Sequence, residues 1–163
     1  MEFSDLTNHK IELLDSVLRA IGVSSLFENP DFKIDEGSKG FHNLIINVYS
    51  DERITVPLAI LIEGDGLRVD VCGLDEAFEW PDDYVFTARQ EIVDFFYKLF
   101  TSYVLIETCG PAWAKTRMYL FGTDGQLLCK HGLRGFFQGF SGWDCDKTLY
   151  FPLYKNQGQR IGE

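Results

Sequence analysis

The sequence predicts one α+β domain, built from a mostly antiparallel β-sheet with two main helices packed on one face. Three observations predict this class. Two segments with helical periodicity stand far apart, strand-like segments come in pairs joined by glycine-containing turns, and few connections are long enough for a parallel crossover. A chain of 163 residues, 45% of them hydrophobic, is also large enough to bury its own core.

Two segments carry the apolar periodicity of amphipathic helices. In residues 6–21, leucine, valine and isoleucine recur at helical spacing, and Gly22 is a typical C-terminal stop. Residues 87–101 have a wider apolar face, and Thr87 with Gln90 matches a capping box at the start of that helix. We expect both helices to pack their apolar faces on the sheet.

Strand-like segments account for most of the remaining chain. We expect strands at residues 43–49, 54–63, 67–72, 103–107, 116–121, 126–130 and 148–154, with a short one at 32–34 inside a loop of residues 28–40. Pro57 cannot donate a ladder hydrogen bond, so its strand is expected at an edge or a bulge. Asp124 and Gly125 predict a type I′ hairpin turn. The last strand is expected to carry three apolar side chains on one face: Leu149, Phe151 and Leu153.

The N-terminal residues and the cysteines predict a compartment. Acidic residues precede the first apolar residues, so no signal peptide is expected, and no apolar run is long enough to span a membrane. The four cysteines form no CxxC pair, and we expect free buried thiols in a cytoplasmic protein: Cys72, Cys109, Cys129 and Cys145. The domain is expected to cover residues 1–154, followed by a polar tail at 155–163.

Charge is distributed unevenly along the chain. Residues 1–85 hold 18 acidic and 6 basic residues, a net charge of −12, whereas residues 86–163 hold 7 acidic and 9 basic residues, a net charge of +2. A polyanion would be repelled by the first part, so nucleic acid is not expected as a direct ligand. An acidic surface favours solubility, and it also suits a basic protein partner.

Residues 75–84, which we call the acidic-aromatic segment, contain five acidic and three aromatic residues and no basic residue. Aromatic anchors supply contact energy in protein interfaces, and surrounding carboxylates steer a basic partner toward them. The candidate partner-binding residues are Asp75, Glu76, Phe78, Glu79, Trp80, Asp82, Asp83 and Tyr84. The alternative is that Phe78 and Trp80 fold back into the core beneath the second helix.

Residues 132–143, from Gly132 to Trp143, are rich in glycine and aromatic residues. They begin like an RNA-binding strand signature, but Phe137 and Gln138 break that pattern. Glycine lets backbone approach a ligand closely, so the segment is a candidate lid over a small-molecule pocket near His131 or Asp144. A bulged strand covering the core is the alternative.

Motifs for catalysis and metal binding are incomplete. Ser141 sits in a partial nucleophile elbow whose second glycine is replaced by Trp143. Cys109 lacks a second cysteine at redox spacing. Cys129, His131 and Cys145, with Asp144 or Asp146, are metal-ligating types without the paired spacing of a zinc site. The sequence therefore predicts no catalytic residue, no metal and no cofactor.

Three functional hypotheses follow from these patterns. The first is a non-enzymatic acidic protein that occludes a basic protein partner, most concretely an immunity or inhibitor protein that neutralises a cationic nuclease toxin. The second is a small-molecule-binding or enzymatic domain with residues 132–143 as its lid, and the third is a subunit of a larger assembly. Under the first, Trp80→Ala with Asp82 and Asp83 changed to Asn should weaken binding without unfolding the domain.

Overall fold

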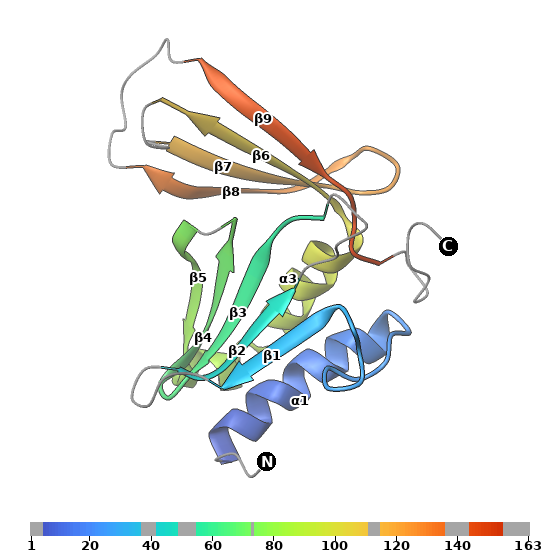
Figure 1. Ribbon diagram of the computed structural model, residues 1–163, viewed down its shortest axis with the longest axis vertical. Coiled ribbons are helices and arrows are strands. Elements are labelled where there is room, and N and C mark those ends of the chain that lie inside the picture. Colours follow the sequence, from blue (N-terminus) through green and yellow to red (C-terminus); the bar gives the residue numbers. More distant parts are fainter. Residues whose placement is uncertain are drawn as a thin grey trace.

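The computed structural model describes residues 5–36, 42–48, 55–72, 74–110, 115–135 and 144–154 (Figure 1). These residues form two antiparallel sheets and three helices, and the predicted α+β class is confirmed. In chain order the elements are α1 (Asp5–Ala20), β1 (Phe32–Glu36), β2 (His42–Val48), β3 (Leu58–Glu63), β4 (Gly66–Val71), β5 (Leu74–Pro81), α2 (Asp82–Thr87), α3 (Arg89–Thr101), β6 (Tyr103–Cys109), β7 (Lys115–Phe121), β8 (Leu127–Gly135) and β9 (Cys145–Tyr150).

The first sheet is a meander in which β1 to β5 pair in chain order, each antiparallel to the next. Along β3, alternate side chains are buried, as expected for a strand with one face on a core. The helices α1 and α3 contact each other and lie along this sheet (Figure 1), and their apolar stripes join the core. The periodicity of the sequence thus places both main helices against the sheet.

The second sheet has the order β8-β7-β6-β9, so β6 pairs with β7 on one side and with β9 on the other. Val104, Ile106, Met118 and Leu120 form its buried face. The two sheets meet where β8 contacts β5 (Figure 1). The sequence predicted one antiparallel sheet, and the structure has two. The junction between them lies beside the acidic-aromatic segment.

The start of the second helix differs from the prediction. Pro81 ends β5 and is the N-cap residue of a short helix, α2, whose first turn carries Asp82 and Asp83, because acidic side chains are favoured at a helix N-terminus. Thr87 therefore closes α2, and its hydroxyl donates back to the carbonyl oxygen of Asp83 at 2.9 Å. The N-cap of α3 is Ala88, which makes no side-chain cap hydrogen bond. The predicted capping box is wrong.

Pro57 and the β7–β8 turn also differ from expectation. Strand β3 starts at Leu58 and lies between β2 and β4, so Pro57 precedes the strand and the predicted edge position is wrong. In the turn, Gly125 has φ +80°, but Asp124 does not adopt positive φ, so type I′ is wrong. The Gly125 amide donates to the Gly122 carbonyl at 2.9 Å, which is the pattern of a type I turn followed by a left-handed glycine.

The last strand is an edge strand with mostly exposed residues. Leu149 is 50% exposed and Phe151 43% exposed, whereas Leu153 is buried. The expected common apolar face is therefore only partly against the core. The cause is the register of β9 (Cys145–Tyr150): Leu149 lies opposite Leu105 on the outer face of the second sheet, whereas Tyr150 lies opposite the buried Val104.

Two cysteines contradict the expectation of free thiols. Cys109 ends β6 and lies opposite Cys145 at the start of β9, with their Cα atoms 4.2 Å apart, and the two form a disulfide. Cys72 and Cys129 are free. Spacing along the chain gives no sign of this pair, because the 36-residue separation is closed only when β9 returns beside β6. The expected polar tail, residues 155–163, lies outside the described residues.

Candidate binding cavity

The acidic-aromatic segment is a strand and a short helix. Residues 75–81 belong to β5, and Asp82, Asp83 and Tyr84 begin α2. Because successive side chains of a strand point to opposite faces, Phe78 and Trp80 share one face and Glu79 lies on the other. Asp75 and Glu76 are in β5, but their side chains lie outside what the structure describes.

The two aromatic rings of β5 pack on α3. Trp80 is only 8% exposed and Phe78 is half-buried. The Phe95 ring of α3 lies 4.4 Å from the Phe78 ring and 5.2 Å from the Trp80 ring, measured between centroids. Of the two arrangements that the sequence allows, the rings thus adopt the one against the second helix, and Trp80 is not an exposed anchor.

The three residues that follow β5 have different surroundings. Asp82 forms an ion pair with Lys10 of α1 at 2.6 Å, and the Lys10 side chain is 1% exposed. The Lys10 ammonium also donates to the backbone carbonyl of Glu63 at 2.8 Å. Asp83 and Tyr84 are exposed. Asp82 therefore neutralises a buried cation, which is a structural role.

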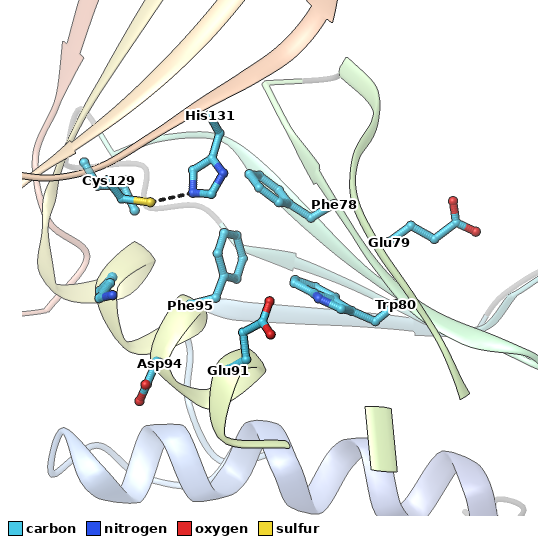
Figure 2. A pocket seen from close by; sticks show the side chains of 10 residues that line it. Phe78, Glu79, Trp80, Glu91, Asp94, Phe95, Cys129 and His131 are labelled. Atoms are coloured by element: carbon cyan, nitrogen blue, oxygen red, sulfur yellow. Dashed lines mark hydrogen bonds between the residues drawn. The ribbon is translucent and has the colours of Figure 1, made fainter. Parts of the chain in front are cut away.

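A cavity of about 530 Å³ lies between β5, α3 and the second sheet (Figure 2). Its wall combines the aromatic rings of β5 and α3 with four ionisable side chains and residues of β7 and β8. The lining residues are Phe78, Glu79, Trp80, Glu91, Asp94, Phe95, Lys98, Leu120, Cys129 and His131. The predicted segment thus contributes one wall, and the other walls come from elements that the sequence did not connect with it.

The carboxylates around this cavity are not equivalent. Figure 2 shows the Glu91 carboxylate turned toward the aromatic rings, whereas the carboxylates of Glu79 and Asp94 point away from them. Glu91 accepts a hydrogen bond from the Tyr84 hydroxyl at 2.7 Å. This bond, together with the negative charge of Glu91, raises the pKa of Tyr84. Glu91 is therefore held in place at the mouth of the cavity by the exposed end of the acidic-aromatic segment.

Cys129 and His131 lie on the cavity side of β8. They are two residues apart on one strand, so both side chains point to the same face, and Cys129 Sγ lies 2.7 Å from His131 Nε2. The His131 ring stands edge-on to Phe78 at 4.8 Å between centroids. Burial lowers the pKa of His131, and the charge of Lys98 lowers it further. Sequence spacing marked these two residues only as weak metal ligands.

The residues of metal-ligating type that the sequence analysis named do not all lie together. Cys145 is bonded to Cys109 on the outer face of the second sheet, away from Cys129 and His131. Among the described residues, one group has metal-ligating atoms close together, Glu107 with these two disulfide cysteines. Both sulfur atoms of that group are used by the disulfide.

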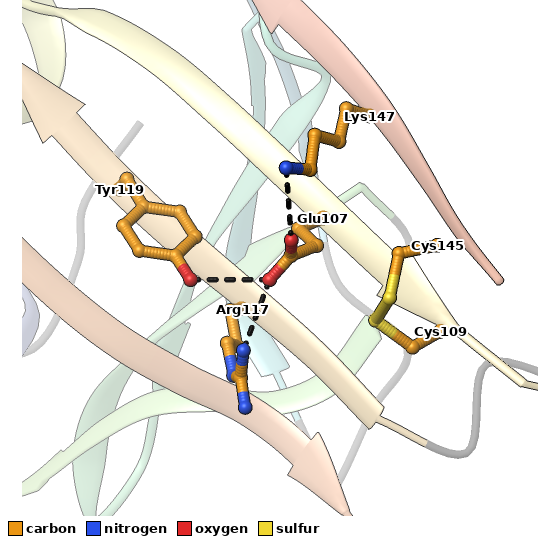
Figure 3. Close-up of a disulfide and its surroundings, with 6 residues drawn as sticks. All are labelled: Glu107, Cys109, Arg117, Tyr119, Cys145 and Lys147. Atoms are coloured by element: carbon orange, nitrogen blue, oxygen red, sulfur yellow. Dashed lines mark hydrogen bonds and ion pairs between the residues drawn. A yellow bond between two sulfur atoms is a disulfide. The ribbon is translucent and has the colours of Figure 1, made fainter. Parts of the chain in front are cut away.

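The outer face of the second sheet carries a polar cluster that the sequence did not indicate (Figure 3). Glu107 accepts hydrogen bonds from Arg117 and from the Tyr119 hydroxyl, both at 3.1 Å, and pairs with Lys147 at 3.4 Å. Burial would raise the pKa of Glu107, but these partners outweigh it and lower the pKa. The cluster joins β6, β7 and β9 beside the Cys109–Cys145 disulfide. Because the Glu107 carboxylate has three partners, we assign the cluster a structural role in holding these strands together.

The candidate lid, residues 132–143, lies only partly within the described residues. Residues 132–135 belong to β8, and residues 136–143, with Ser141, lie outside the described ranges. Asp144 is exposed. Of the residues named for a small-molecule pocket, His131 lines the cavity.

Fold and cavity together define a two-sheet α+β protein with an aromatic, acid-rimmed cavity at the junction of its sheets. No family model, curated protein or solved structure matches the chain. Within the described ranges, none of the helices is both long enough and apolar enough to cross a membrane.

Proposed function

We propose that this chain is a non-enzymatic binding protein that occludes a basic protein partner by accepting a cationic side chain of that partner at the cavity. The most concrete form is an immunity or inhibitor protein that neutralises a cationic nuclease toxin. The observation that supports it is that three aromatic rings, those of Phe78, Trp80 and Phe95, line one cavity and that the carboxylate of Glu91 lies at its opening.

The chemistry of this cavity suits a guanidinium or ammonium group. A cation over an aromatic face gains about 0.5–1 kcal/mol at an exposed site and about 2 kcal/mol when desolvated. A carboxylate such as that of Glu91 adds a charge-assisted hydrogen bond. Glu79 and Asp94, which also line the cavity, and Asp83 at the start of α2 are exposed acids, and an acidic surface accelerates encounter with a basic partner.

The structure changes the roles of two residues that the sequence predicted to contact a partner, Trp80 and Asp82. Trp80 is proposed as a wall of the cavity and Asp82 as the partner of a buried lysine, so neither is a free contact. Glu79, Asp83 and Tyr84 are exposed and remain proposed contacts. Asp75 and Glu76 remain proposed contacts from the sequence alone.

Capture from a lysate of source cells tests the proposal. A tagged chain is incubated at about 50 mM and about 500 mM salt, which shortens the Debye length from about 14 Å to about 4 Å, and bound proteins are identified by mass spectrometry. The expected result is a basic protein that is retained better at low salt. Failure to retain any basic protein at either salt would refute the proposal for partners present in that lysate.

A charge-matched pair of variants then tests the cavity. Glu91→Gln removes the charge but keeps an acceptor for the Tyr84 hydroxyl, and Glu12→Gln removes an exposed charge from α1. We expect about ten-fold weaker binding of the captured protein for the first variant and less than about two-fold for the second. Equal effects would mean that the acidic surface acts only through net charge.

A small-molecule site is the second candidate function. The cavity volume of about 530 Å³ lies in the range of ligand sites, and His131, with its lowered pKa, is on the wall. A small cation that binds the isolated chain, with sensitivity to Glu91→Gln and without capture of any basic protein, would favour it.

We retain a cytoplasmic location as part of the proposal, although one feature of the structure, a disulfide, favours a different compartment. The Cys109–Cys145 disulfide is typical of an oxidising compartment, since cytosolic proteins keep most thiols reduced. Fractionation of source cells, with thiol labelling before and after reduction, decides between the cytoplasm and an oxidising compartment. A fully reduced pair in the soluble cell extract would support the cytoplasm.

A further inference from the structure

The chain has one free thiol in its cavity, and that thiol is paired with an imidazole. Cys129 Sγ and His131 Nε2 are 2.7 Å apart, and Cys129 is partly exposed on the cavity wall. Figure 2 shows the sulfur and the ring nitrogen facing each other, with the Phe78 ring beside His131 and the Phe95 ring below. The other described free thiol, Cys72, is held differently, because burial raises its pKa to about 11.

The imidazole is suited to accept the proton of this thiol. Thiolate is the reacting form of cysteine, and an adjacent base is the usual way to produce it. Burial and then the ammonium of Lys98 lower the pKa of His131, so the imidazole is neutral at rest and its Nε2 can accept a proton. The same effects make it a weaker base, so the proton moves to Nε2 only as the sulfur attacks the reagent. The ionisable groups that line the cavity around the pair are Glu79 on β5 and Glu91, Asp94 and Lys98 on α3.

The cavity also selects the reagent. A group bonded to Cys129 Sγ would extend into a space walled by Phe78 and Phe95 with the Glu91 carboxylate nearby. Aromatic faces and a carboxylate attract an ammonium group and repel a carboxylate. The Lys98 ammonium on the same wall opposes this preference, but three carboxylates, those of Glu79, Glu91 and Asp94, outnumber it. The preferred electrophile is therefore small, flexible and cationic.

We propose that Cys129 is a modification site that undergoes thiol–disulfide exchange with low-molecular-weight disulfides that carry an ammonium group, with His131 as the base. The Cys129 sulfur transfers its proton to His131 Nε2 and attacks one sulfur of the reagent. A new S–S bond forms, the S–S bond of the reagent breaks, and the departing thiolate takes the proton from His131. Cys129 is oxidised and the released thiol is the reduced product.

Two symmetric reagents of similar length and opposite charge test the reaction on the wild-type chain. Cystamine carries two ammonium groups and 3,3′-dithiodipropionate carries two carboxylates. Intact mass and peptide mapping follow the adduct on each cysteine, including Cys109 and Cys145. We expect cystamine to modify Cys129 at least about five-fold faster than the dianion does, and Cys72 to stay unmodified on that time scale. Equal rates for both reagents, or no adduct on Cys129, would overturn the proposal.

Variants assign the roles of the base and the carboxylate. His131→Gln should slow the cystamine reaction at least about ten-fold, because general-base assistance contributes a hundred-fold or more in typical sites. His131→Asn is the second variant if the first does not fold, as judged by circular dichroism. Glu91→Gln should reduce the preference for cystamine while the rate with the dianion holds or rises. A rate unchanged in a folded His131 variant would show that the thiol reacts without the imidazole, and the proposal would fail.

Discussion

Replacing Asp82 by asparagine should destabilise the domain, because this carboxylate is the counter-charge of a buried lysine. The Lys10 side chain is 1% exposed and that of Asp82 is 19% exposed. Removing one partner of a buried ion pair typically costs about 3–5 kcal/mol. Lys10 keeps its bond to the Glu63 carbonyl, and some water reaches Asp82, so we expect the lower end, about 3 kcal/mol.

Urea unfolding followed by circular dichroism measures this loss as a lower midpoint with an unchanged slope. Asp83→Asn is the matched control, since it makes the same charge change one residue away at an exposed position, and it should alter stability by less than about 0.5 kcal/mol. A second variant, Lys10→Met in the Asp82→Asn background, should recover much of the loss because no uncompensated charge stays buried. Equal midpoints for the two asparagine variants would refute the structural role of Asp82.

Four further outcomes are expected. Trp80→Ala should cost about 3–5 kcal/mol in urea unfolding, because it empties a buried site. The stability of the wild-type chain should fall as the pH drops below 6.5, because there the unfolded chain protonates His131 before the folded chain does, and a His131→Gln variant should lose this part of the pH dependence. Stability should also fall as the pH rises from about 9 toward 11, where only the unfolded chain ionises Cys72, and Cys72→Ser should remove that decline. Changing Cys109 and Cys145 to serine should lower the free energy of unfolding by about 4 kcal/mol and lower the melting temperature, since the bridge closes a long loop; an unchanged melting temperature would contradict this.

Local patterns predicted the elements well and their ends less well. The first helix, expected at residues 6–21, is Asp5–Ala20, because its periodicity and its glycine stop are local features of the chain. The capping-box prediction at Thr87 was wrong for a reason that is also local but easy to overlook. A short helix begins at Asp82, directly after Pro81, with two acidic residues in its first turn, which leaves Thr87 at the end of that helix instead of at the beginning of the next.

The cavity could not be predicted, because its parts are far apart in sequence. Phe78, Phe95 and His131 come from β5, α3 and β8, and only the meeting of two sheets brings them together. The sequence did mark the aromatic residues of β5 as unusual, and they form part of the site. It offered no sign of Glu91, whose place at the opening depends on how α3 packs against β5.

The position of β9 has a consequence for assembly. The strand reaches β6 from across the sheet, without a hairpin turn to guide it, so β6 has an open hydrogen-bonding edge until β9 arrives. During that interval the β9 of a second molecule can take the same place in the same register, which is the route to a domain-swapped dimer. We expect refolding at high protein concentration under reducing conditions to produce such dimers, visible by size-exclusion chromatography, and oxidation of Cys109 with Cys145 beforehand to suppress them by tying each strand to its own chain.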